Sequence, residues 1–219
     1  MLTKVELVPY GVNGDVSLIA AVKHDYSLDG QILGVGAVTE QRNFLLLIQA
    51  FRRLRVVYPR LSLKIIGHVY YGEPVRLAHR LGLADAVRFE GERPHETVLN
   101  EMKHSAVFWG GLSLGRYRGL GTASLEAMLS GLPVFADVPR TLLGVGNDAL
   151  LDMTHLVIID GKDEDQAIAR LELVLRDPEL RRRIGEGGRA YVLAHMGWEK
   201  VAGKVETIAL NVINGRNST

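Results

Sequence analysis

The sequence predicts an α/β fold, a Rossmann-like doubly wound parallel sheet with helices on both faces. Short, nearly continuous apolar runs rich in β-branched residues alternate with longer segments of helical periodicity. Parallel strands that are buried on both faces have this character. Several strand-to-helix switches hold Gly, Asn or Thr, and 47% of the 219 residues are hydrophobic, which is enough for a sizeable core.

Six strands are expected, at Ile32–Val35, Leu61–Ile66, Val87–Phe89, Ala106–Trp109, Val134–Ala136 and Leu156–Ile159. Helices are expected at Asn43–Val57, Glu73–Leu81, His95–Lys103, Thr122–Ser130, Asp163–Leu175 and Pro178–His195. The β-α alternation favours right-handed crossovers. We therefore expect one Rossmann-like domain at residues 31–197, preceded by a less regular lead-in segment (1–30) and followed by a C-terminal helix and tail (198–219).

Composition excludes several classes of function. The net charge of +1 gives no electrostatic footprint for nucleic acid, so no nucleic-acid partner is expected. The absence of cysteine excludes disulfides, thiol catalysis and Cys-ligated zinc, and favours a cytoplasmic setting. The seven histidines show no metal-ligand spacing, so no metal is expected and most of them are interpreted as surface or core residues. No apolar run reaches the roughly 18 residues that span a bilayer.

Two other patterns are interpreted as structural rather than functional features. The basic run Arg181–Arg183 has acidic neighbours, and a solvated helix face is the simplest explanation. The Gly34–Gly36 segment after a strand is similar to a dinucleotide fingerprint, but Thr39 occupies its third glycine position. No acidic residue lies at Arg52–Tyr58, where a ribose-binding carboxylate would be expected, so NAD binding is not expected.

The most informative stretch is Arg116–Met128, which follows a strand and opens a helix. Gly119 and Gly121 allow a tight turn and leave room for a ligand. The amides of the first helical turn and the helix dipole would then form a phosphate site. Glu126, about one turn inside the helix, could accept the two hydroxyl hydrogen bonds of a ribose diol. On the residues alone, a structural turn beside a surface glutamate is an equally good explanation.

This stretch also resembles a known family. The run Gly119-Leu120-Gly121, followed by Glu126 to Val134, is similar to the E-G-F-G-x-x-x-x-E-A-M-A-x-G-x-P-V motif of group 1 (family four) retaining glycosyltransferases of the GT-B fold. The resemblance covers most of the chain and includes Val8–Asn13, Val35–Phe51, Leu63–Gly67, Leu81–Gly91, Asp177–Arg181 and Gly197–Glu199. It identifies the chain as similar to the C-terminal, nucleotide-sugar-binding domain of these enzymes.

The resemblance implies a donor site for a nucleotide diphosphate sugar, with a UDP- or GDP-sugar as substrate and no other cofactor. Glu126 inherits the contact to the ribose, and the main chain of Glu90–Arg93 that to the base. The resemblance and the strand-end loops together give the donor-binding candidates Gly36, Arg42, Glu92, Arg118, Gly119, Leu120, Gly121, Thr122 and Glu126. Arg42 and Arg118 are the catalytic candidates, because positive groups would stabilise the departing diphosphate without a metal.

Two positions depart from the family pattern. Arg118 stands where the family has the glutamate that contacts the transferred sugar, and a guanidinium only donates hydrogen bonds where a carboxylate only accepts them. Ala37 stands where a clamping arginine is expected. Arg118 therefore either replaces the clamp charge, binds an acidic sugar, or is a solvated loop residue in a degenerate site.

The leading functional hypothesis is the donor-binding half of a retaining hexosyltransferase. Its acceptor-binding N-terminal half is expected to be missing, supplied by a longer chain or by a partner, with peripheral membrane association through that half left open. A non-catalytic nucleotide-sugar-binding or regulatory module and a nucleotide-sugar epimerase are the alternatives. Val201, Val205, Ile208 and Val212 form an apolar stripe, which predicts self-association through residues 198–213 when that half is absent.

Overall fold

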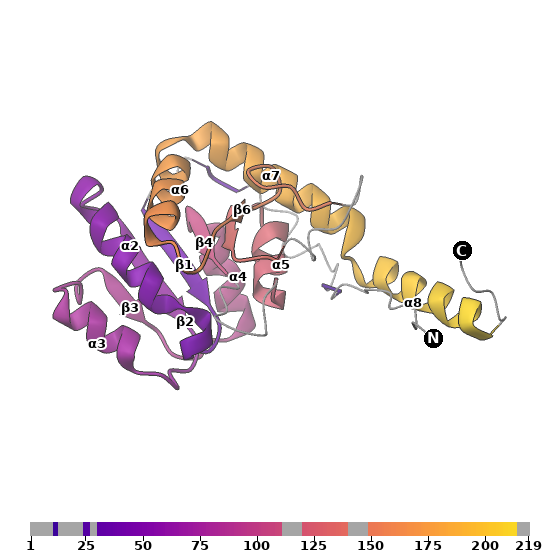
Figure 1. The fold of residues 1–219 in the computed structure, drawn as a ribbon, viewed down its shortest axis with the longest axis horizontal. Helices are drawn as coiled ribbons and strands as arrows, with labels where there is room; N and C mark the ends of the chain where they lie inside the picture. The colour runs from indigo at the N-terminus through magenta and orange to yellow at the C-terminus, as the bar shows by residue number, and fades with distance from the viewer. Residues whose placement is uncertain (1–10, 13–23, 27–29, 111–119, 140–148, 214–219) are drawn as a thin grey trace.

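The computed structural model describes residues 11–12, 24–26, 30–110, 120–139 and 149–213 (Figure 1). Its sheet has six strands, all parallel, in the order β3-β2-β1-β4-β5-β6. The strands are β1 (Gln31–Val35), β2 (Ser62–Ile66), β3 (Val87–Phe89), β4 (Val107–Trp109), β5 (Val134–Ala136) and β6 (Val157–Ile158). The order reverses between β1 and β4, which is the topological switch point of a doubly wound sheet. The predicted fold class is confirmed.

A short 3-10 helix, η1 (Glu40–Arg42), precedes the first long helix. The helices are α2 (Phe44–Val57), α3 (Glu73–Arg80), α4 (His95–Lys103), α5 (Thr122–Leu129), α6 (Glu164–Arg176), α7 (Pro178–His195) and α8 (Trp198–Ile213). Every predicted strand and helix is present, with its ends within one residue of the expected positions. The prediction did not include η1, because a single 3-10 turn is too short to produce an apolar period.

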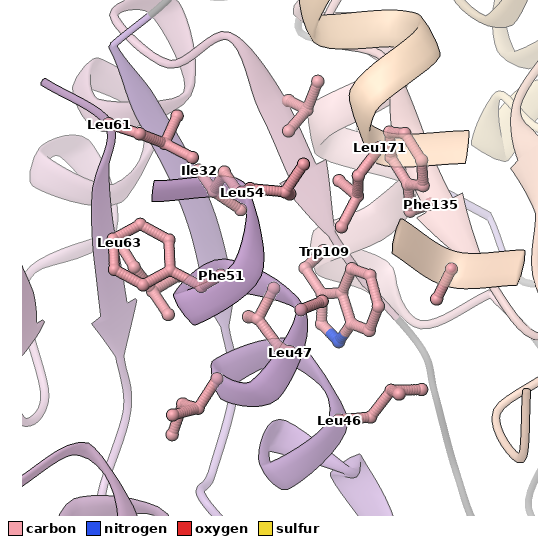
Figure 2. Packing of buried hydrophobic residues seen from close by; sticks show 14 of the residues in the cluster. Ile32, Leu46, Leu47, Phe51, Leu54, Leu61, Leu63, Trp109, Phe135 and Leu171 are labelled. Atoms are coloured by element: carbon pink, nitrogen blue, oxygen red, sulfur yellow. The ribbon is translucent and has the colours of Figure 1, made fainter. Parts of the chain in front are cut away.

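Two hydrophobic clusters lie on opposite faces of the sheet. One packs α2, α3 and α6 against the strands, around Phe51, Leu63, Trp109 and Phe135 (Figure 2). The other packs α4 and α5 against the opposite face, around Phe108 and other buried side chains. Because the strand side chains alternate between these clusters, both faces are dry, which explains the continuous apolar character of the strand sequences.

Helix α7 joins the two clusters: its first half contributes to one and its second half to the other. Glycines in its middle allow a close approach to neighbouring backbone. A Cβ on Gly185 would lie 2.0 Å from the carbonyl oxygen of Gly131, and a Cβ on Gly188 would lie 2.4 Å from that of His155. Any side chain at these positions would therefore force the helix away from the sheet.

Unlike the other helices, α8 does not pack along the sheet. Figure 1 shows it projecting away from the sheet and the helices that cover it. Of the predicted apolar stripe, Val201 is buried at 6% exposure, whereas Val205 is 50% and Val212 76% exposed. The helix exists as predicted, but most of its stripe is uncovered by the described residues. Within the described part of the chain, no helix is long and apolar enough to cross a bilayer.

The interpretation of Arg181–Arg183 as a solvated face is wrong for Arg181, which is 1% exposed. Its guanidinium donates hydrogen bonds to the carbonyl oxygens of Tyr26, Val174 and Leu175. The last two carbonyls belong to the final turn of α6, which has no intrahelical donors for them. Arg182 does fit the interpretation, because it is exposed and pairs with Glu179 and Glu186. The sequence pattern could not tell which arginine of the run points inward.

Candidate donor-binding site

The loop after β1 places a cation at the carboxyl edge of the sheet. Gly36 has a φ of +132°, a backbone conformation that side chains disfavour, and a Cβ there would lie 2.7 Å from the Cζ of Arg42. The guanidinium of Arg42 therefore packs directly over the Gly36 backbone. Arg42 is half-buried, and burial lowers its pKa. A glycine is needed here for both the turn and the arginine.

Arg42 keeps most of its hydrogen-bonding capacity free. The structure gives it one hydrogen bond, from Nη1 to the carbonyl oxygen of Val35 at 3.5 Å, which is at the limit for such a bond. It forms no ion pair with any described carboxylate. A half-buried guanidinium carries five N–H donors and a permanent charge. Such a group at the ligand edge of a parallel sheet is suited to an anion.

The residue after Arg42 fixes this loop. Asn43 lies in the left-handed region with φ 49°, is buried, and donates from Nδ2 to the carbonyl oxygen of Gly161 at 2.7 Å. The amide of Gly161 in turn donates to Oδ2 of the buried Asp137 at 3.4 Å. Three loops of the carboxyl edge are thus joined, and the position of Arg42 is set before any ligand arrives.

Backbone hydrogen bonds link this loop to its neighbours on the other side. The Gly36 amide donates to the carbonyl oxygen of Ile66, and the Gly67 amide donates to that of Gly91, both at 2.8 Å. The second bond leads to the segment Glu90–Arg93, where Arg93 pairs with Glu90 at 2.6 Å. Glu92 lies exposed on the same segment. The expected base-reading loop is therefore adjacent to the loops of β1 and β2.

The N-terminus of α5 is open, unlike those of the two structural helices that follow. The side chains of Asp163 and Asp177 cap α6 and α7 by accepting from backbone amides. No described side chain caps α5, whose N-cap is Gly121 and whose first turn holds no acidic residue. Gly121 and Thr122 are exposed. The amides of Thr122 and Ala123, which have no acceptor among the described residues, and the positive end of the helix dipole therefore face the carboxyl edge.

Glu126 lies one turn inside α5 and is paired across the edge. Its Oε1 is 2.9 Å from Nε2 of His95, the first residue of α4. The Glu126 side chain is 16% exposed and that of His95 66% exposed. Helices α4 and α5 lie side by side, and both begin at the carboxyl edge, so their first turns converge. Sequence reasoning missed His95, although it opens a helix at this edge as Thr122 does.

The structure thus places Gly36, Arg42, Glu92, Leu120, Gly121, Thr122 and Glu126 on loops and helix starts at one edge of the sheet. Hydrogen bonds connect the β1 loop to the β2 loop, the β2 loop to the segment before α4, and the first residue of α4 to Glu126. Arg42 and Glu126 form no hydrogen bond or ion pair with each other. Arg118 and Gly119 lie outside the described residues. Ala37 lies half-buried beside Gly36 and adds no charge to the site. Among the described residues, no three His, Asp or Glu side chains gather in a way that could hold a metal ion.

The sequence is similar to that of known glycosyltransferases. A curated relative, a GDP-mannose-dependent monoacylated alpha-(1-6)-phosphatidylinositol monomannoside mannosyltransferase of Corynebacterium glutamicum, is 29% identical over 171 residues, which are 74% of this chain and 42% of the relative. The chain therefore spans less than half the length of that relative.

Two solved structures share the fold. The C-terminal domain of a glycosyl transferase group 1 family protein from Francisella tularensis matches with a TM-score of 0.64 and 17% identity, over 86% of this chain and 96% of that one. Anabaena HepE in complex with UDP and glucose matches with a TM-score of 0.75 and 16% identity, over 93% of this chain and 56% of that one. The described fold is thus that of one half of a GT-B glycosyltransferase.

The family itself is given by the sequence rather than by these distant structures. The model of the family described as glycosyl transferases group 1 matches residues 23–191. This range covers most of the chain and includes every described residue of the candidate site. The chain belongs to the group 1 glycosyl transferases.

Proposed function

We propose that this chain binds a nucleotide diphosphate sugar at the carboxyl edge of its sheet and serves as the donor half of a retaining hexosyltransferase. The diphosphate would lie between Arg42 and the open N-terminus of α5, with the ribose diol on Glu126. Arg42 and Arg118 would stabilise the charge that develops on the departing diphosphate. Glu92 and its neighbours would lie along the base.

The observation that carries this proposal is the guanidinium of Arg42, half-buried and without a carboxylate partner in the described chain. Taking a charge partly out of water is costly unless an opposite charge compensates it. The loop nevertheless holds Arg42 in place through Gly36 and Asn43. A bound diphosphate would provide the missing anion and accept several charge-assisted hydrogen bonds.

The comparisons support a nucleoside diphosphate without choosing its base. The Corynebacterium relative is described as GDP-mannose-dependent, whereas the Anabaena structure holds UDP. The shared element is the diphosphate, which is the part that Arg42 and the α5 amides would contact. We propose a UDP- or GDP-sugar as the donor, and a second domain outside this sequence as the source of acceptor contacts.

A non-catalytic nucleotide-sugar-binding module is the second candidate. Ala37 favours it, because the family resemblance puts a clamping arginine there and the structure places no charge at that position. The family match to residues 23–191 favours a transferase over an epimerase.

Calorimetry with UDP, GDP, UMP and GMP tests the proposal. We expect one diphosphate to bind, the matching monophosphate to bind at least about ten-fold more weakly, and Arg42→Gln to weaken diphosphate binding by about 10- to 100-fold. Arg53→Gln is the matched control, because Arg53 lies on α2, the helix after Arg42, and pairs with Asp165. Equal binding by wild type and Arg42→Gln would remove the diphosphate role. Transfer of labelled sugar in the complete enzyme, abolished by Arg42→Gln, would separate a transferase from a binding module.

A further inference from the structure

The contact between His95 and Glu126 is not explained by packing. Both side chains lie at the carboxyl edge, and the imidazole remains 66% exposed. Their heavy atoms are 2.9 Å apart, a normal length for a hydrogen bond to a carboxylate. Resting on the proposed function, we propose that His95 is a positioning residue for the donor site, which orients the Glu126 carboxylate for the ribose diol.

The convergence of two helix starts makes this contact possible. His95 is the first residue of α4, directly after Pro94, whose backbone is extended with φ −54° and ψ 144°. The fixed ring of proline restricts this entry to the helix, so the first side chain has a set direction. Glu126 projects from the second turn of α5, beside α4.

The neighbouring cation on this segment does not bind the Glu126 carboxylate, and His95 does. Arg93, the cation two residues earlier on the same segment, is engaged with Glu90 at 2.6 Å. Among the described side chains, His95 is the one that contacts the Glu126 carboxylate. Without it the carboxylate would be free to rotate about its side-chain torsions, and ordering those torsions on binding has an entropic cost.

The contact leaves Glu126 able to bind a ligand. Only Oε1 meets His95, and a carboxylate accepts about four hydrogen bonds through its two oxygens. With Nε2–H donating to Oε1, Oε2 and the remaining lone pair of Oε1 can accept from the two ribose hydroxyls. His95 thereby fixes which side of the carboxylate meets the diol. The substrate class is a nucleotide with an intact ribose, as opposed to a deoxyribose.

A double-mutant cycle measures this role. The probe is whichever of UDP and GDP the chain binds more tightly, beside its 2′,3′-dideoxy analogue. We expect His95→Ala to weaken binding of the ribonucleotide by about 3- to 10-fold, the size expected for one ordered hydrogen bond. His95→Gln, which retains an N–H donor, should stay within about two-fold of wild type. The effect of His95→Ala should vanish with the dideoxy analogue and in a Glu126→Ala background.

The possible results distinguish failure of the positioning role of His95 from failure of the donor site itself. If the diphosphates bind and Glu126→Ala weakens them, but His95→Ala binds as wild type, the positioning role is wrong and the donor site stands. If His95→Ala weakens binding equally in the Glu126→Ala background, His95 contacts the ligand itself and the positioning role is again wrong. If no nucleoside diphosphate binds wild type, the proposed function falls and the inference with it. His79→Ala, an exposed histidine on α3, is the control for losing an imidazole.

The contact can also be tested without a ligand. Nitrogen NMR of the histidine rings distinguishes the Nε2–H from the Nδ1–H form. We expect the Nε2–H signal of His95 to be shifted by its hydrogen bond to Glu126 in wild type, and to move toward that of a solvated imidazole in Glu126→Ala while the signal of His79 is unchanged. A His95 spectrum that is the same in both chains would contradict the contact.

Discussion

Arg181 and Arg42 are both at least partly withdrawn from solvent, and their surroundings differ in one respect. Arg181 is buried at 1% exposure and its guanidinium is engaged by three backbone carbonyls at the α6–α7 junction. Arg42 is half-buried at the carboxyl edge and has a single long hydrogen bond. A buried polar group normally has its partners. Arg181 has its acceptors within the chain and is structural. Arg42 has N–H donors that no described group uses, so it is available for a ligand.

The comparison shows what distinguishes a fold-stabilising charge from a binding one. Burial alone does not, because both residues have lost part or all of their contact with water. The number of donors already used within the chain does, because only unused donors can add free energy when a ligand binds. We expect variants of these two arginines and of their surroundings to separate the two roles.

Replacing Arg181 with Met should lower the free energy of unfolding by about 3–5 kcal/mol, because three buried carbonyls lose their donor. Urea denaturation followed by circular dichroism measures this. Arg182→Met, one residue further and exposed, should change stability by less than about 1 kcal/mol, since its ion pairs are on the surface. Similar losses in the two variants would contradict the assignment of Arg181 as structural.

Acid should destabilise the same region through His24, which faces Arg181. Burial, with added repulsion from Arg181 and His104 and opposed by Asp25, lowers the pKa of His24 to about 4. In the unfolded chain this histidine has its ordinary pKa of 6.5 and therefore takes up the proton more readily. Stability present above pH 6.5 is lost as the pH falls toward 4, by about 3 kcal/mol in total. The free energy of unfolding of His24→Leu, measured across this range, should lose that part of the slope; an unchanged slope would show that other groups cause it.

At the carboxyl edge, Gly36→Ala should weaken both the fold and the site. The φ of +132° disfavours any side chain, and the new Cβ would displace the Arg42 guanidinium. We expect a loss of about 1–3 kcal/mol in stability, together with diphosphate binding as weak as that of Arg42→Gln. Gly30→Ala is the control, because a Cβ there meets nothing within 4 Å. Calorimetry that finds wild-type affinity in Gly36→Ala would mean that Arg42 does not act from its observed position.

The smallest effect on stability is expected on α8, where most of the apolar stripe has no partner among the described residues. Val205→Ser and Val212→Ser should each change the free energy of unfolding by less than about 0.5 kcal/mol, because both are at least half exposed. Val201→Ser, at a buried position of the same helix, should cost clearly more. We predict that the two exposed substitutions reduce self-association in sedimentation measurements. A wild-type chain that remains monomeric at high concentration would refute that prediction.

The order and ends of the strands and helices could be predicted from the sequence, since apolar period and turn residues are local properties of the chain. The sequence also selected Arg42, the loop into α5 and Glu126 as a candidate site, through spacing and family resemblance. Only the tertiary structure decided which arginine of Arg181–Arg183 is buried, because helical position relative to a neighbour is not encoded in a run of like charges. It alone placed His95 against Glu126, since the two residues are 31 positions apart and meet only because α4 and α5 start at the same edge of the sheet.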